Sequence, residues 1–264
     1  MKNRIIFGSL AFVILIASTI FSDLIFLAGC FILSAMMIWE LYHTLKLKIN
    51  KLVLLVGFLI LFMFSITEYT QIEWGIWLLA SVLLIYYLFS DCTFSDISKT
   101  FMITIYIVLP MISLYYIRIM EYGEYLVWFA LLGAVASDTF AIFVGKWFGK
   151  MKLFEKVSPK KTIAGSIGGI IGVIICFIAF AYIIAYQTGN VISYTQVVIL
   201  AIISSVFSQL GDLVASRIKR EHHRKDYGDI IPGHGGILDR CDSILLVAPV
   251  VFVWLTLLFD KLFI

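Results

Sequence analysis

The sequence has little charge and few cysteines. Charged residues make up 14% of its 264 positions, and they cluster in short stretches between long apolar runs. This pattern excludes intrinsically disordered chains and nucleic-acid-binding proteins, both of which expose far more charge. The four cysteines lie far apart and form no Cys-x-x-Cys pair, so neither a zinc site nor a redox motif is indicated.

Apolar residues are abundant instead. They make up 62% of the chain before glycine is counted, whereas soluble domains reach about 45–50% with glycine included. A bilayer core about 30 Å thick needs about 20 helical residues per span. Uncharged apolar runs of suitable length lie at 5–22, 24–44, 52–67, 74–90, 100–117, 124–145, 165–186, 194–216 and 242–260. The sequence therefore predicts an all-α, polytopic integral membrane protein with about nine transmembrane helices and no soluble domain.

The distribution of basic residues predicts the orientation of the chain. With a cytoplasmic N-terminus, only Arg118 and Lys261 among the 20 lysines and arginines fall on the outer side. Cytoplasmic loops of membrane proteins carry such an excess of positive charge. The two polar segments 146–161 and 217–240 then face the cytoplasm. No small-x-small cleavage site follows the first span, so we interpret it as a retained helix rather than a signal peptide.

Polar residues within the predicted spans are concentrated in the second half of the chain. We therefore divide it into N-terminal transmembrane helices, 1–120, and a C-terminal catalytic region, 121–264. Asp138 lies inside a span, where a carboxylate costs several kcal/mol unless it is paired, hydrated or metal-bound. A functional role is the leading interpretation. The alternative is a buried acid that joins helices or pairs with a lysine.

The segment 158–162 combines a proline with two lysines just before a glycine-rich helix start. Lys160 and Lys161 are candidates for a phosphate site, because the helix dipole and the ammonium groups attract the same anion. The alternative is that these lysines anchor the chain at the membrane surface. Gly165 and Gly168 would then serve close helix packing.

The charge density is highest between residues 209 and 243. Asp212 lies inside a span, and Asp239 and Asp242, three residues apart, are predicted to share a face at the start of the last helix. Neighbouring cations are Lys219, Arg220, Lys225 and Arg240. Oxygen ligands for Mg²⁺ beside fixed cations are the parts needed for phosphoryl or nucleotidyl transfer. Mutual charge neutralisation is the alternative, but it does not account for Asp212 within a span.

Three glycines surround His234 in the stretch 232–236. Glycines allow a backbone to approach a ligand closely and to offer its N–H groups. We therefore rank a phosphate or nucleotide contact for His234 ahead of a structural hydrogen bond, and a role as general base last.

Residues 216–242 form a long pattern, Ser216-x-Ile218-Lys219-Arg220-x₄-Lys225-Asp226-x-Gly228-x₂-Ile231-Pro232-x-His234-Gly235-Gly236-Ile237-x-Asp239-Arg240-x-Asp242. It resembles the signature of the phosphatidate cytidylyltransferases, also called CDP-diacylglycerol synthases. The segments 137–145 and 158–162 resemble that family as well, whereas the first 120 residues agree only in hydrophobic character. Two departures are visible: Cys241, and Ile163-Ala164 in place of a common Trp-Glu pair, which removes a carboxylate near the predicted phosphate site.

The resemblance implies transfer of CMP from CTP to phosphatidate, which gives CDP-diacylglycerol and pyrophosphate and requires Mg²⁺, with one or two metal ions. It further implies a homodimer in a bacterial cell membrane, with CTP, phosphatidate and membrane lipid as partners. The predicted metal ligands are Asp212, Asp239, Asp242 and Asp138, and the predicted catalytic residues are Asp212, Asp239, Lys219 and Arg220. The predicted substrate contacts are Lys225, Asp226, His234, Gly235, Gly236, Arg240, Lys160, Lys161 and Ser216.

Two other functions fit part of the pattern. In a cation transporter, Asp138 and Asp212 would lie on an ion path, but the basic, glycine-rich loop would have no task. In a CTP-dependent polyprenol kinase, the γ-phosphate would be transferred, and CDP would be released instead of CMP being incorporated.

Overall fold

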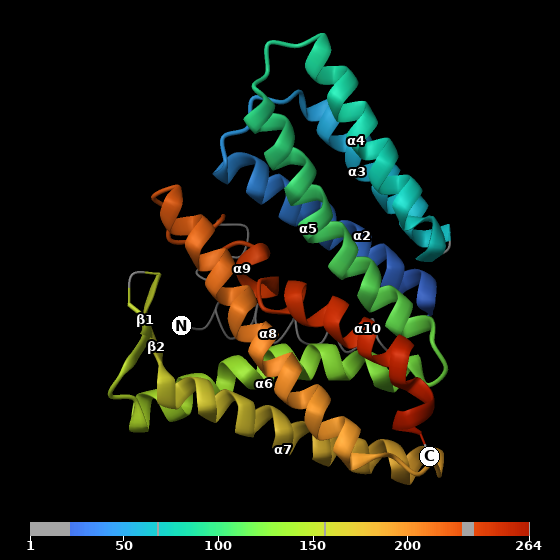
Figure 1. Ribbon diagram of the computed structural model, residues 1–264, viewed down its shortest axis with the longest axis vertical. Coiled ribbons are helices and arrows are strands. Elements are labelled where there is room, and N and C mark those ends of the chain that lie inside the picture. The colour runs from blue at the N-terminus through green and yellow to red at the C-terminus, as the bar shows by residue number, and fades with distance from the viewer. Residues whose placement is uncertain (1–21, 68, 156, 229–234, 264) are drawn as a thin grey trace. The chain divides into compact units, whose positions relative to one another are not determined.

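The structure is a computed structural model that describes residues 22–67, 69–155, 157–228 and 235–263 (Figure 1). It confirms the all-α architecture, to which a single two-stranded sheet is added among the described residues. The predicted first span lies outside the described residues except for its last position, and so does His234. The predicted count of nine spans and the cytoplasmic N-terminus therefore stay predictions.

Each of the other predicted spans coincides with a helix. The elements are α2 Asp23–Thr44, α3 Lys51–Thr67, η1 Tyr69–Gln71, α4 Ile72–Leu88, α5 Phe94–Ile119, α6 Gly123–Phe148, β1 Lys152–Phe154, β2 Ser158–Thr162, α7 Ile163–Thr188, α8 Tyr194–Glu221, α9 Leu238–Cys241 and α10 Ile244–Leu262. Among the described residues, five of these helices are long and apolar enough to cross a membrane, and three more are shorter and apolar. The chain is an integral membrane protein.

The chain forms two compact units. The first comprises the described residues up to Tyr115 together with 226–240, and the second comprises 116–225 with the described residues from Cys241 onward. The sequence places its boundary near residue 120. Tertiary contacts place this boundary between Tyr115 and Tyr116. They also assign the segment 226–240, which carries most of the signature, to the N-terminal unit. We call residues 226–240 the signature loop.

Within the first unit, α2, α3 and α4 pack through aromatic and small residues. The Phe31 ring on α2 lies 5.1 Å from that of Phe58 and 4.9 Å from that of Phe62, both on α3. The pairing of α3 with α4 depends on Gly57, because a Cβ there would lie 2.8 Å from the Leu79 side chain. The unit is thus built from helices that approach at small side chains, as is typical in membranes.

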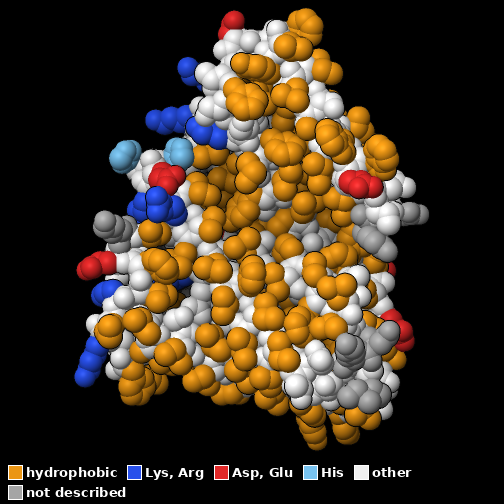
Figure 2. Space-filling view, in the orientation of Figure 1, with side chains coloured by type: hydrophobic (Ala, Val, Ile, Leu, Met, Phe, Trp, Pro, Cys, Tyr) orange, Lys and Arg blue, Asp and Glu red, His pale blue; other side chains and the backbone are white. Residues whose placement is uncertain are grey.

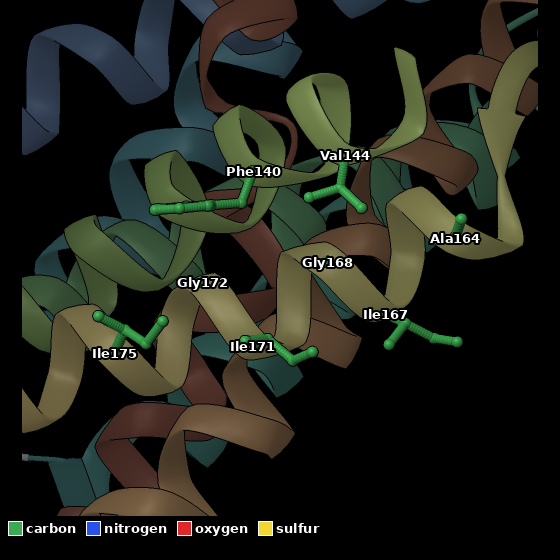
Figure 3. A pocket seen from close by; sticks show the side chains of 8 residues that line it. All are labelled: Phe140, Val144, Ala164, Ile167, Gly168, Ile171, Gly172 and Ile175. Atoms are coloured by element: carbon green, nitrogen blue, oxygen red, sulfur yellow. The ribbon is translucent and has the colours of Figure 1, made fainter. Parts of the chain in front are cut away.

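Within the second unit, α6 packs against α7, and α8 packs against α6, α7 and α10 (Figure 1). Figure 3 shows Phe140 and Val144 of α6 lying over Gly172 and Gly168 of α7. A Cβ on Gly168 would lie 2.4 Å from Val144, and one on Gly172 would lie 2.2 Å from Phe140. This geometry supports the packing interpretation of the glycine-rich helix start. The contact borders an apolar groove of about 360 Å³.

Large apolar side chains are exposed on both units. Phe89 of the first unit is 86% exposed, and Trp147 and Tyr186 of the second unit are 71% and 83% exposed. Figure 2 shows hydrophobic side chains over most of the visible surface. Apolar patches of this extent are rare on soluble monomers, so we interpret these surfaces as facing lipid.

The polar segment after α6, for which the sequence predicts a loop, forms the hairpin of β1 and β2. The strands pair antiparallel, with Lys152 opposite Thr162. Their lengths of three and five residues give no usable alternation, and Pro159 argues against a strand. Thr162 then caps α7, since its side chain accepts a hydrogen bond from the Gly165 N–H at 3.1 Å.

Candidate functional site

An ion pair joins β2 to α8 in the second unit. Lys161 Nζ lies 2.8 Å from Asp212 Oδ2, and the two side chains are 20% and 29% exposed. The Lys161 ammonium also donates to the Gln209 carbonyl at 3.1 Å, and Ser216 Oγ donates to Asp212 Oδ1 at 3.2 Å. Three residues predicted to serve the site, Lys161, Asp212 and Ser216, therefore lie together.

Buried polar contacts fix this pair in place. Gln209 Nε2 donates to the Ser166 carbonyl at 3.1 Å and to Ser205 Oγ at 3.3 Å, while Ser166 Oγ donates to Gln209 Oε1. Ser205 in turn shares a hydrogen bond of 3.0 Å with Ser137 of α6. Helices α6, α7 and α8 are thus joined by hydrogen bonds that meet the ion pair at Gln209. Such a network gives the charged pair a rigid support.

Two further carboxylates lie close to the start of α10. Ser243 Oγ donates to Asp138 Oδ2 at 2.8 Å, and the Ser243 N–H donates to Asp242 Oδ1 at 2.8 Å. At Gly211, a Cβ would lie 2.7 Å from the Asp242 carbonyl oxygen, so α8 approaches this turn closely. Asp138 joins α6 to the turn before α10, which matches the helix-joining alternative. Its carboxylate also interacts electrostatically with that of Asp242.

Asp242 completes a group of like charges. It lies in the turn that precedes α10, outside the helix, and its Oδ2 is 4.0 Å from Lys219 Nζ. Burial raises the pKa of its carboxyl to about 7, the Asp212 and Asp138 carboxylates act in the same direction, and the Lys219 ammonium opposes them. Three acids and two lysines therefore influence one another in the second unit. A divalent cation or a phosphate would change the balance among them.

The remaining predicted cations lie toward solvent. Helix α8 continues to Glu221, so Lys219 and Arg220 are on the helix rather than in a loop. Lys219 is buried, whereas Arg220 is exposed and donates to the Arg224 carbonyl at 3.2 Å. The other exposed cations predicted for the substrates are Lys160, Lys225 and Arg240.

In the first unit, Asp239 closes the signature loop. Its Oδ2 accepts the Tyr227 N–H at 2.8 Å and the Gly236 N–H at 3.0 Å. Gly235 has a φ of +82°, a left-handed conformation that favours glycine, and a Cβ there would lie 3.4 Å from the Asp226 side chain. Asp239 belongs to the short helix α9, whereas the last helix begins at Ile244. The two aspartates expected at the start of one helix thus lie apart, Asp239 on α9 and Asp242 in the turn after it.

Sequence reasoning missed Glu40. This residue of α2 is 3% exposed, and it accepts the Ile237 N–H at 2.9 Å and the Leu238 N–H at 2.8 Å. The signal was available, because Glu40 lies inside the predicted span 24–44. The cost of a carboxylate in the membrane, which singled out Asp138, applies to it equally.

The donors in the second unit suit Mg²⁺. Among the described residues, no three His, Cys, Asp or Glu side chains lie close enough together to enclose a metal ion. However, Mg²⁺ is commonly held by one or two carboxylates, with water and substrate phosphates as its other ligands. A carboxylate oxygen also retains acceptor capacity after one hydrogen bond. Asp212, Asp242 and Asp138 offer oxygen donors only, so they fit this ion once a phosphate is present.

Known proteins resemble this chain over its full length. Residues 2–258 match the sequence model of a family described as the cytidylyltransferase family. A phosphatidate cytidylyltransferase of Bacillus subtilis (strain 168) is 35% identical over 270 residues, which cover 97% of this chain and 98% of the relative. One of Staphylococcus epidermidis (strain ATCC 12228) is 30% identical over 97% of this chain and 99% of the relative. One of Staphylococcus aureus (strain COL) is 42% identical over half of each chain.

Proposed function

Because the chain belongs to the cytidylyltransferase family, we propose that it transfers CMP from CTP to phosphatidate, giving CDP-diacylglycerol and pyrophosphate. The observation that carries this proposal is the pair of Lys161 and Asp212, 2.8 Å apart, with Asp242 and Lys219 beside it in the second unit. The names of the relatives support phosphatidate as the acceptor.

The reaction depends more on reducing repulsion between the charged substrates than on a general base. A phosphate oxygen of phosphatidate attacks the α-phosphorus of CTP, and the bond from that phosphorus to the bridging oxygen of the β-phosphate breaks. The attacking phosphate monoester is already ionised at neutral pH, so no strong base is needed. The main barrier is repulsion between two polyanions, which fixed cations and correct positioning lower.

The lysines of the second unit are suited to this task. Lys161 is held by Asp212 and by the Gln209 carbonyl, so its ammonium group has a defined position before substrate arrives. Lys219 is 10% exposed and therefore acts in a medium of lower dielectric than water, where its charge has a larger effect. We assign both to the phosphates of the two substrates. Arg220 and Lys225, at the exposed end of α8 and just after it, would meet the departing pyrophosphate.

We assign the metal to the carboxylates. Asp212, with Asp242 or Asp138, would hold Mg²⁺, and Asp239 is a further ligand predicted from the sequence. A bound Mg²⁺ would supply positive charge to the phosphate oxygens of both substrates. Asp212 would at the same time keep Lys161 oriented, because its two oxygens have separate partners.

The location and assembly follow from the sequence. We propose that the reaction occurs on the cytoplasmic side of a bacterial cell membrane, since the basic segments gather on one side by the positive-inside rule. We also propose a homodimer, in keeping with the family resemblance, with no nucleic-acid partner. The mass of the purified protein in detergent, corrected for bound detergent, tests the dimer.

The test follows the α-phosphorus. Purified protein in lipid micelles is given phosphatidate, Mg²⁺ and CTP labelled at that atom, beside Asp212→Asn and Asp239→Asn variants. We expect label in the lipid phase and free pyrophosphate, both lost in the variants and after chelation of Mg²⁺. Labelled CDP in the aqueous phase with unlabelled lipid would overturn the proposal in favour of a kinase. Full turnover by either variant would remove that residue from the site.

A further inference from the structure

Glu40 uses both of its oxygens on the backbone of the signature loop. Oε1 accepts the Ile237 N–H at 2.9 Å, and Oε2 accepts the Leu238 N–H at 2.8 Å. The residue lies one turn before the end of α2 and is 3% exposed. An apolar side chain could fill the same space, but it would leave two buried N–H groups without an acceptor. The carboxylate therefore serves the loop.

The same turn of α2 reaches the other side of the loop. Thr44 Oγ1 donates to the Tyr227 carbonyl at 3.4 Å, and the Tyr227 side chain is 1% exposed. Asp239 accepts the Tyr227 N–H and the Gly236 N–H with one oxygen. Both described ends of the signature loop are thus attached to α2 and tied to each other through Asp239.

Two glycines of the signature make room for Glu40. A Cβ on Gly236 would lie 2.5 Å from Glu40 Oε1, and one on Gly228 would lie 3.1 Å from the same atom. The first distance is far below ordinary van der Waals contact, so any side chain at position 236 would displace the carboxylate. The close approach of Glu40 therefore accounts for glycine at these two positions, as the approach of a ligand would.

We propose that Glu40 is a positioning residue, which sets the conformation of the signature loop from the N-terminal helices. This inference rests on the proposed function, because the loop carries Gly235, Gly236 and Asp239, which we expect to serve nucleotide and metal. It assigns a role in the reaction to the N-terminal helices, which lie outside the segments that carry the signature pattern.

The first experiment measures the loop itself. Glu40→Gln and Glu40→Ala proteins are compared with wild type and with Glu73→Gln, an exposed glutamate of α4 in the same unit. Hydrogen exchange is followed by mass spectrometry on the full chain in lipid nanodiscs. We expect the amides of Ile237 and Leu238 to exchange at least tenfold faster in both Glu40 variants. The amides of α3 and α4 should not change.

The second readout is kinetic and depends on the reaction. In the Glu40 variants we expect kcat/KM for CTP to fall about tenfold to a hundredfold, as for loss of hydrogen bonds to a charged group. The KM for phosphatidate should stay within twofold. Simple loss of folded protein would lower kcat and leave both KM values unchanged, so a rise in the KM for CTP identifies a positioning role. Glu73→Gln should match wild type.

A double-mutant cycle tests the contact directly. Gly236→Ala should reduce kcat/KM strongly in wild type, because the new methyl group meets the Glu40 carboxylate. In a Glu40→Ala background the space is open, so the same substitution should cost much less. Equal effects in both backgrounds would contradict a direct role of this contact.

Two outcomes would overturn the proposal. Unchanged exchange at Ile237 and Leu238 would show that Glu40 does not hold the loop. Faster exchange with an unchanged kcat/KM would show that the loop is held but that its position does not matter for transfer. If wild-type protein transfers no CMP, the proposed function fails, and the exchange experiment still decides whether Glu40 orders the loop.

Discussion

The two units use their buried and half-buried carboxylates in different ways. In the second unit, Asp212 and Asp242 face the ammonium groups of Lys161 and Lys219. In the first unit, Glu40 and Asp239 face backbone N–H groups. A lysine side chain can turn toward an arriving phosphate, whereas a backbone N–H moves only with its loop. The second unit is thus arranged to exchange charge partners, and the first to maintain a shape.

The largest expected effect is that of Asp212→Asn, which removes the charge at the centre of the exchanging group. We expect kcat to fall at least a hundredfold, because one preorganised electrostatic contact is worth about that much in other enzymes. Asparagine keeps the size of the side chain, so the protein should fold. The measurement is CMP transfer from labelled CTP.

Glu221→Gln is the matched control for Asp212→Asn. It removes a carboxylate from the exposed end of the same helix, where the side chain is 55% exposed. We expect it to keep wild-type turnover. Equal turnover of the two variants would show that the acids of α8 have no distinct role and would erase the contrast between the units.

Lys161→Ala should have the next largest effect. It removes a held ammonium group and leaves the Asp212 carboxylate without its cation, so we expect kcat/KM to fall about tenfold to a hundredfold. Lys152→Ala, at an exposed position in the same hairpin, is the control and should stay within twofold of wild type. If both lysines behave alike, the hairpin acts only as a positive anchor at the membrane.

Gly168→Ala tests the shape of the second unit without changing its charge. The new Cβ would lie 2.4 Å from Val144, so α6 and α7 must separate, at a cost of about 1–3 kcal/mol. We expect a lower thermal midpoint in detergent and unchanged KM values. Gly29→Ala is the control, since nothing lies within 4 Å of its Cβ. A stable Gly168→Ala protein would contradict the close packing of these helices.

The smallest effect belongs to a surface pair. Arg217 Nε lies 2.8 Å from Glu221 Oε1, but these side chains are 66% and 55% exposed. Because solvent screens the two charges, such a pair stabilises the folded protein by about 0.5 kcal/mol or less. Arg217→Ala should therefore shift the thermal midpoint by no more than about 1–2 °C. A larger shift would mean that exposed charges of α8 contribute as much as the half-buried pair with Lys161.

Local features of the fold were predictable from the sequence. Spans depend on the length of an apolar run, so α2 to α8 and α10 coincide with predicted segments. The prediction that Asp212 has a functional role also needs only the local sequence, because a carboxylate within a span is costly wherever its partner lies. The boundary of α8 was less accurate. Its last turn carries Lys219 and Arg220. Because these residues are charged, the apolar run stops before the helix does, and hydropathy alone does not locate the end of the helix.

Contacts across long sequence separations were not predictable. The partner of Asp212 is Lys161 on the hairpin, and the partners of Glu40 are backbone groups, which leave no mark in the amino-acid sequence. Short strands such as β1 also give no periodic signal. Motif reading identified the loop, but not the helix that holds it.

The attachment of Glu40 also has a consequence for biosynthesis. Its partner Ile237 lies 197 positions later in the chain, and ribosomes add about 5–20 residues per second, so α2 waits about 10–40 s for it. During that time the carboxylate must be hydrated near the membrane surface, because an unpaired acid in the bilayer is costly. A nascent chain that stops before the signature loop retains this unpaired acid.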